Sequence, residues 1–242
     1  MSSKMGRHCF LNLETFFFHV GINSLIITTF STEIVSYPDW QYEACRPKNY
    51  GTGPNITYPF YVVDNETDFC GYPGFKVSSE AKKPVYRTSL SDYFIEDIFY
   101  QSNSFHLVNV EVINSRCPAL LHDFAFDSSP FQFGPNFAGL YLFYNCSNLF
   151  PSNYAQTNGF NCSQFPCELS VHAPVEIEGG QQNRVVETMD YAELLRTGFT
   201  LEWMGISCAA ECENSGGHCG FNNNNSVRFC PDRPYGKRCN ND

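Results

Sequence analysis

The sequence predicts a mostly β fold with minor α content, cross-linked by disulfides and divided into two modules. Phe and Tyr are abundant, at 23 and 14 residues, and 17 Gly and 14 Pro supply turns. Such a composition is typical of short strands joined by loops. Twelve cysteines in 242 residues then indicate that cross-links, rather than one large apolar core, stabilise the loops.

The cysteines and the glycosylation sequons both indicate a compartment outside the cytosol. Thiols at this density oxidise to disulfides there, and each sequon marks exposed backbone that could carry a glycan. The disulfide candidates are Cys45, Cys70, Cys117, Cys146, Cys162, Cys167, Cys208, Cys212, Cys219, Cys230 and Cys239. The sequons begin at Asn55, Asn65, Asn145, Asn161 and Asn224.

The amino-terminal residues 1–36 predict a secretory leader. Lys4 and Arg7 precede an apolar stretch over residues 9–30, and small residues follow it. The stretch is interrupted by Glu14 and is shorter than the roughly 20 apolar residues of a spanning helix. A cleaved leader is therefore favoured over an uncleaved anchor or a misjudged start codon, and no later segment is apolar enough to span a bilayer.

Four segments of the first part of the chain predict strands. They are rich in aromatic and β-branched residues and are bounded by Gly, Pro, Asn or Ser. The predicted strands cover residues 58–63, 92–100, 104–113 and 140–144. In the predicted strand 104–113, apolar residues fall on both faces. Both faces of this strand should therefore be covered by other parts of the protein.

One helix is predicted after residue 189. Asp190 and Glu193 form a capping-box pattern, Leu194 and Leu195 give an apolar patch, and Gly198 ends the helix. Residues 199–203 then alternate, which indicates a half-buried strand. With the last cysteines, this helix and strand suggest a second, smaller module.

The segment from Cys208 to Cys239 has too few residues between cysteines to bury a core of its own, so cross-links must stabilise it. A zinc site is the competing interpretation, because His218 adjoins Cys219. The spacings match no zinc-finger pattern, and secreted cysteines oxidise first. We therefore expect neither a metal nor a cofactor.

Charge and motifs exclude several function classes. Between residues 88 and 183 the only cation is Arg116, so a polyanion would be repelled there and nucleic-acid binding is excluded. No nucleophile elbow, zinc-protease helix, phosphate loop or kinase signature is present. Asp92, Glu96 and Asp97 could form a hydrolytic carboxylate group, but this spacing is more typical of a solvated strand edge. We expect no enzyme activity.

Three motifs resemble the galacturonan-binding domain of plant wall-associated receptor kinases. They are Cys-Arg-Pro-Lys-Asn-Tyr-Gly at 45–51, Asn-Ile-Thr-Tyr-Pro-Phe at 55–60 and Phe-Cys-Gly-Tyr-Pro-Gly-Phe at 69–75. Segments 97–100, 117–118, 142–146, 198–203 and 214–221 resemble the rest of such an ectodomain, in its leaf-rust-resistance receptor-like kinase type. The resemblance runs from residue 42 to residue 242.

The resemblance implies a domain order and a location. Residues 42–112 would form the galacturonan-binding-like β module, 113–183 a continuation of the β-rich ectodomain, and 184–242 the carboxyl-terminal Cys-rich module. We expect neither a transmembrane helix nor a kinase domain in the mature chain. We expect a secreted product of the cell wall, or a truncated copy of a receptor on the outer face of the plasma membrane.

The implied ligand is cell-wall pectin, a polymer of galacturonate. Binding would use cations for the carboxylates and aromatic faces for the sugar rings. The candidate ligand-binding residues are Arg46, Lys48, Tyr58, Tyr72, Lys76, Lys82, Lys83 and Arg87, with Tyr50, Tyr61 and Tyr86 as further platforms. The alternatives are a protein-interaction or co-receptor ectodomain for a peptide partner, a diverged receptor copy, and, last, a hydrolase.

Three positions depart from the family pattern, which has cysteines where this chain has Tyr50, Ser79 and Arg228. If the first two normally pair with each other, Cys45 and Cys70 remain as a pair.

The departure at Arg228 predicts an unpaired thiol. It leaves eleven cysteines after the leader, so one thiol must be free or bridged to another molecule. Thiol titration of the denatured protein should therefore find at least one reactive thiol per monomer. Finding none, without a covalent dimer, would contradict the odd count.

Overall fold

The computed structural model describes residues 39–62, 67–113, 115–116, 118–125, 130–146, 167–177, 190–206, 214–231 and 239. The predicted leader, Asn65, Asn161 and cysteines 9, 117, 162, 208 and 212 lie outside these residues. No helix within the described parts is long and apolar enough to cross a membrane.

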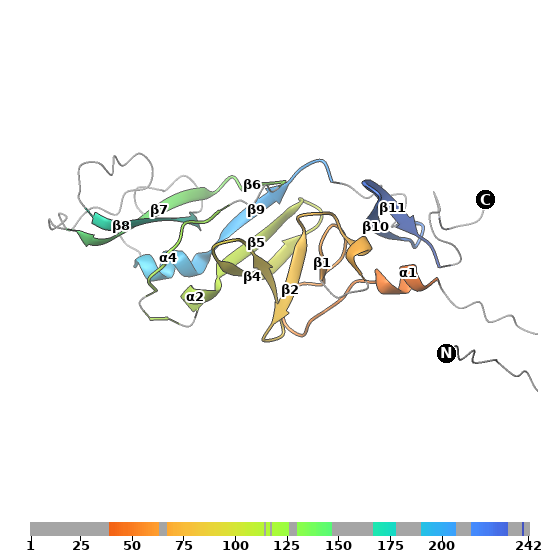
Figure 1. Cartoon of the computed structure of the whole chain (residues 1–242), viewed down its shortest axis with the longest axis horizontal. Helices are drawn as coiled ribbons and strands as arrows, with labels where there is room; N and C mark the ends of the chain where they lie inside the picture. Colours follow the sequence, from red (N-terminus) through yellow and green to blue (C-terminus); the bar gives the residue numbers. More distant parts are fainter. Residues whose placement is uncertain are drawn as a thin grey trace, which may run out of the picture. The chain divides into compact units, whose positions relative to one another are not determined.

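Seven of the described strands form one sheet in the order β1-β2-β3-β4-β5-β9-β6 (Figure 1). Strands β2 to β5 follow one another as an antiparallel meander, and β1 pairs with β2 in parallel. Two strands from later in the chain complete the sheet. β9 pairs with β5, and β6 pairs with β9. The bounds are β1 (Tyr61–Val62), β2 (Lys76–Glu80), β3 (Lys83–Arg87), β4 (Asp92–Phe99), β5 (Ser104–Asn109), β6 (Phe131–Phe133) and β9 (Phe199–Trp203). The chain is therefore mostly β, as predicted.

Strand β5 is central, and its two faces are largely buried as its sequence predicts. The predicted strand 104–113 is nevertheless wrong at its end, where residues Val110–Ile113 form helix α2. The cause is Asn109, whose Oδ1 accepts a hydrogen bond from the backbone N–H of Glu111 at 2.8 Å, as at a helix start. The helix then buries Val112 in a second apolar cluster.

The predicted strand 58–63 is reduced to β1. Tyr58 and Pro59 lie before it, in a turn, and the peptide bond between them is cis. Proline has no N–H to donate to a strand ladder, which explains why pairing begins only after it.

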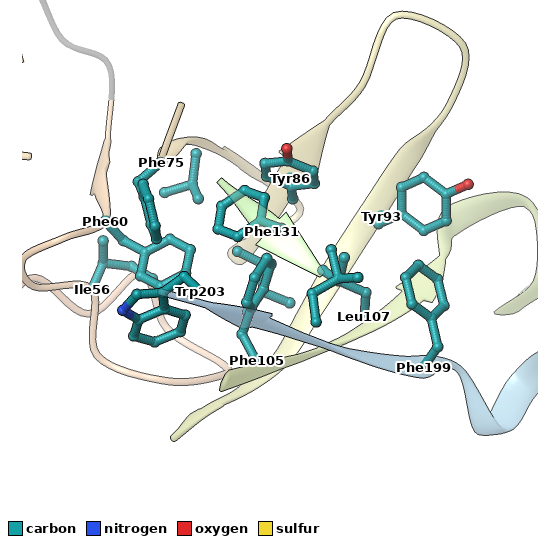
Figure 2. Packing of buried hydrophobic residues seen from close by; sticks show 13 residues of the cluster. Ile56, Phe60, Phe75, Tyr86, Tyr93, Phe105, Leu107, Phe131, Phe199 and Trp203 are labelled. Atoms are coloured by element: carbon teal, nitrogen blue, oxygen red, sulfur yellow. The ribbon is translucent and has the colours of Figure 1, made fainter. Parts of the chain in front are cut away.

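The main sheet packs over an aromatic core (Figure 2). The ring of Phe60 lies 5.0 Å from Phe75, 5.0 Å from Phe105 and 5.3 Å from Trp203, each in an edge-to-face arrangement. Burial also raises the pKa of Tyr93 to about 12. Many of the aromatic residues that dominate the composition are thus structural, so they offer no open ring face to a ligand.

A second layer is built from β7 (Phe137–Cys146), β8 (Cys167–Glu176) and helix α4 (Tyr191–Thr197). β7 and β8 form an antiparallel hairpin, and α4 buries Leu194 and Leu195 in the apolar cluster that contains the hairpin. The helix and its end at Gly198 were predicted correctly. The structure requires glycine at this position, because its φ is +70° and a Cβ there would collide with the carbonyl oxygen of Leu107. The capping box does not form, because the Asp190 side chain makes no cap hydrogen bond.

The carboxyl-terminal hairpin, β10 (His218–Asn222) and β11 (Asn225–Phe229), packs against the start of the described chain. Phe229 is fully buried beside the Cys45–Cys70 disulfide, and its ring lies 5.4 Å from that of Phe69 in the 3-10 helix η1 (Asp68–Cys70). Cys230 is bonded to Cys239. This cysteine-rich segment therefore buries the side chain of Phe229 against the amino-terminal module. The three module boundaries stay a prediction.

Candidate functional site

Two of the candidate ligand residues, Lys83 and Arg87, lie in ion pairs on the face of the sheet that is turned away from the aromatic core. Lys83 Nζ lies 3.1 Å from Glu96 Oε1. Arg87 contacts Asp92 at 3.0 Å and Glu80 at 3.2 Å. Both cations therefore already have carboxylate partners within the sheet.

Buried apolar side chains share this face of the sheet, and Lys83 contacts one of them. Val85 is fully buried and Phe94 is 8% exposed on the same face of the sheet. Lys83 Nζ lies over the Phe94 ring, 5.1 Å from its centre, so the ammonium group makes a cation–π contact with the ring. Lys83 and Arg87 therefore both take part in contacts within the sheet.

Two acidic residues of the hydrolase alternative belong to the same ion pairs. Asp92 bonds to Arg87 and Glu96 to Lys83, while the exposed Asp97 follows a bulge in β4. Each of these two carboxylates thus has a cation partner of its own in the sheet. Because β4 is an interior strand, these acids lie along the sheet and not at its edge.

The predicted tyrosine platforms are occupied by packing. Tyr58 is 6% exposed and its hydroxyl lies 3.2 Å from Ser226 Oγ, and burial raises its pKa. The ring of Tyr72 lies 4.7 Å from Phe221 of β10. Tyr86 is buried in the aromatic core, and Tyr50 packs against it. Tyr58 and Tyr72 thus hold the carboxyl-terminal hairpin.

The remaining candidates, Arg46 and Lys48, follow helix α1 (Trp40–Ala44) and line one cavity together. We call this region the α1 edge and define it by five residues: Trp40, Tyr42, Arg46, Lys48 and His218. Trp40 is 63% exposed. Tyr42 stacks on His218 at 4.3 Å, and the Arg46 guanidinium lies 5.8 Å from the Tyr42 ring centre. The α1 edge therefore combines exposed ring surface with positive charge.

Local structure holds this edge in place. Asp39 begins α1, and its Oδ1 accepts hydrogen bonds from the backbone N–H groups of Gln41 and Tyr42. Lys48 pairs through its backbone with Ile56, at 2.9 and 2.8 Å. The backbones that carry Tyr42 and Lys48 are thus fixed, although much of the surface around them is open.

A small cavity lies beneath the edge, against the Cys45–Cys70 disulfide. Four candidate residues, Arg46, Lys48, Tyr58 and Tyr61, line it together. Its volume of about 20 Å³ admits a water molecule and no sugar ring. A sugar would therefore have to bind on the open surface above the cavity.

The electrostatics of the edge depend on arginine and lysine. Burial, and then the charge of Arg46, lower the pKa of His218, so the ring stays neutral over more of the acidic range than a free histidine. His218 thus contributes an aromatic face. Arg46 pairs with Glu43 at 2.7 Å, but the two side chains are 57% and 37% exposed. An exposed pair of this kind contributes little and can exchange partners.

Lys76 and Lys82 lie elsewhere and are exposed, the first at the start of β2 and the second in the β2–β3 turn. Neither makes an ion pair with any residue that the structure describes. Sequence reasoning missed Trp40, because the resemblance begins two residues later. The signal that marks it is Asp39, a helix-starting residue that places Trp40 at the first, exposed turn.

Cys219, next to His218, is disulfide-bonded. Its sulfur is therefore no thiolate ligand, which removes the basis of the zinc interpretation.

Two family models match this chain. The wall-associated receptor kinase galacturonan-binding model matches residues 45–109, which include β1 to β5. The wall-associated receptor kinase C-terminal model matches residues 144–233, which include β8, α4, β9 and the final hairpin. The two matched segments share the main sheet, because β9 pairs with β5.

A curated relative is the leaf rust 10 disease-resistance locus receptor-like protein kinase-like 1.2 of Arabidopsis thaliana, which is 32% identical over 232 residues. The match covers 86% of this chain and 35% of the relative, so the chain spans about a third of that protein's length. No solved structure matches. The two models and this relative agree, so the chain belongs to the wall-associated receptor kinase type of ectodomain, with a galacturonan-binding module followed by the C-terminal module.

Proposed function

We propose that this ectodomain binds pectin at the α1 edge. The observation that carries the proposal is the aromatic surroundings of Arg46. The Arg46 guanidinium lies 5.8 Å from the centre of the Tyr42 ring, and that ring stacks on His218. The exposed Trp40 belongs to the same helix as Tyr42, and Lys48 lines the same cavity as Arg46. The galacturonan-binding family model begins at Cys45, so it includes both edge cations.

The chemistry of the α1 edge suits a uronate polymer. The Arg46 guanidinium can bond a carboxylate through two N–H groups, and a pyranose ring can lie on the face of Trp40. The Arg46–Glu43 pair is exposed at both ends, so a ligand carboxylate can replace Glu43 at small cost. A polymer offers many identical carboxylates, which raises the local ligand concentration after the first contact.

The charge distribution limits where such a polymer can approach. The formal net charge is −10, and residues 88–183 carry Arg116 as their only cation. Repulsion from that part should direct a polyanion toward the amino-terminal third. We infer that the chain acts at the cell wall, outside the plasma membrane, as the ligand-sensing part of a receptor-like protein.

Calorimetric titration with an oligogalacturonide of about ten residues tests the proposal, at about 50 mM and about 300 mM salt. We expect binding at low salt that weakens at high salt, because salt screens exposed charge pairs. The double substitution Arg46→Gln/Lys48→Gln should weaken binding by about tenfold or more, equivalent to about 1.4 kcal/mol.

The matched control is Lys83→Gln/Arg87→Gln, which removes the same charge from the sheet face. It should change the affinity by less than about twofold, since these cations lie on strand β3 and not at the α1 edge. Equal losses in the two double variants would contradict a site at the α1 edge and indicate general charge attraction. No binding at low salt would remove pectin as the ligand and favour the peptide or co-receptor alternative.

A further inference from the structure

His218 brings a residue of the carboxyl-terminal hairpin into the α1 edge. It is the first residue of β10, and its ring stacks on Tyr42 of α1 with the centres 4.3 Å apart and an interplanar angle of 20°. Arg46 belongs to the segment that the galacturonan-binding model matches, and His218 to the segment that the C-terminal model matches. The α1 edge is therefore built from both matched segments.

Backbone contacts hold α1 and the hairpin together around this stack. The N–H of Asp39, at the start of α1, donates a hydrogen bond of 2.8 Å to the carbonyl oxygen of Pro231, just after β11. Phe229, which pairs with His218 across the hairpin, is fully buried. A ligand at the α1 edge therefore meets Tyr42 and His218 in a fixed arrangement.

Burial and nearby charges set the protonation of the His218 ring. Burial lowers the pKa of His218 most, the positive charge of Arg46 lowers it further, and the negative charge of Glu43 opposes them. Asp68 is the acidic residue of η1, which packs against β10. Arg228 on β11 is opposite the residue that follows His218, so it lies on the other face of the hairpin. In the free protein the charge of Arg46 therefore favours the neutral ring.

A uronate chain bound at the α1 edge changes this balance. Its carboxylates lie beside Arg46 and offset the positive charge that favours a neutral His218 ring. A carboxylate within about 4–6 Å favours the charged form of a histidine, and the charged ring can donate an N–H to that carboxylate. The face of Tyr42 also attracts a cation that stacks on it. Covering the ring with sugar acts in the opposite direction, so the direction of proton transfer shows which effect prevails.

We propose that His218 is the third cationic group of the pectin site and takes up one proton from solvent when a uronate chain binds. This role of His218 rests on the proposed function, because it needs a uronate at the α1 edge. The added affinity is complete below the pKa of His218 in the free protein and disappears as the pH rises above its pKa in the complex. Because burial and Arg46 hold the free pKa below the ordinary 6.5, affinity should increase as the pH falls from about 7.5 to about 5.5.

Calorimetric titration of the full chain with an oligogalacturonide of about ten residues measures the proton directly. At each pH the titration is run in two buffers that differ in ionisation enthalpy, because the difference in heat counts the protons taken up. At about pH 6 the wild type should take up between about half a proton and one proton per bound oligomer. It should bind about three- to tenfold more tightly at about pH 5.5 than at about pH 7.5.

The matched variants are His218→Phe and His122→Gln. His218→Phe keeps a ring beside Tyr42 that cannot be protonated, so the proton uptake should disappear and the affinities at the two pH values should agree within about twofold. His122 is exposed and lies outside the α1 edge, so its variant should keep the full uptake. If His218→Phe does not fold, nuclear magnetic resonance of His218 in the wild type gives a second measurement. Its titration midpoint should rise when the oligomer is added.

The outcomes distinguish this role from the proposed function. No binding at either pH would refute both. Binding that Arg46→Gln/Lys48→Gln weakens, but that occurs without proton uptake or with proton release, would overturn the role of His218 alone. Equal uptake in the wild type and in His218→Phe would also overturn it and would assign the proton to a carboxyl group such as that of Glu43.

Discussion

Replacing Phe105 by alanine should lower the free energy of unfolding by about 3–5 kcal/mol. Phe105 is fully buried on the central strand β5. Its ring lies 5.0 Å from the rings of both Phe60 and Phe131, and 6.1 Å from Trp203 (Figure 2). Alanine would leave a cavity among these three rigid rings, which come from three separate segments of the chain, so the neighbours cannot collapse to fill it.

Urea unfolding followed by tryptophan fluorescence measures this loss, because Trp203 lies in the same cluster. The matched control is Phe99→Ala, which truncates a 48% exposed ring at the end of β4. The control should cost less than about 0.5 kcal/mol. Similar losses in the two variants would show that the buried rings do not dominate the stability.

The double substitution Cys45→Ser/Cys70→Ser should lower the free energy of unfolding by about 3.5 kcal/mol. The disulfide joins residues 25 positions apart, and removing it frees that loop in the unfolded chain. It also packs against Phe229 of the carboxyl-terminal hairpin and lines the cavity beneath Arg46 and Lys48. We therefore expect the loss of stability to be accompanied by weaker pectin binding.

Thermal unfolding and the calorimetric titration together test this prediction. The control is Cys230→Ser/Cys239→Ser, which opens a loop of nine residues and should cost less, about 2.6 kcal/mol. A larger loss of stability in the control than in the Cys45–Cys70 variant would contradict loop entropy as the main source of the stabilisation by these disulfides. Unchanged pectin affinity in a folded Cys45–Cys70 variant would show that the disulfide does not support the α1 edge.

Several elements could be predicted because their signals are local. Strand β9 follows from the alternation of residues 199–203, and α4 from an apolar patch that ends at Gly198. Helix α2 could not, because Val110, Val112 and Ile113 favour a strand by propensity. The hydrogen bond from the Glu111 N–H to the Asn109 side chain, and the burial of Val112 beside Leu194 and Leu195, outweigh that preference.

The candidate site was also only partly predictable, because contacts between distant segments decide the role of each residue. Sequence could identify cations and tyrosines near the family motifs, but it could not distinguish Lys83, which pairs with Glu96, from Lys48 at the α1 edge. It also could not show that Tyr58 and Tyr72 face a hairpin more than 140 residues away along the chain. Trp40, two residues before the family motifs, was missed altogether.

By itself the sequence determined the β-rich class, the disulfide chemistry, the family and the acidic surface, since these follow from composition, spacing and short motifs. Only the tertiary structure decided which rings are core, which cations are paired, and that β9 of the second matched segment completes the sheet of the first. The reason is physical. Burial and ion pairing depend on which residues meet across the fold, and those contacts join segments far apart in the chain.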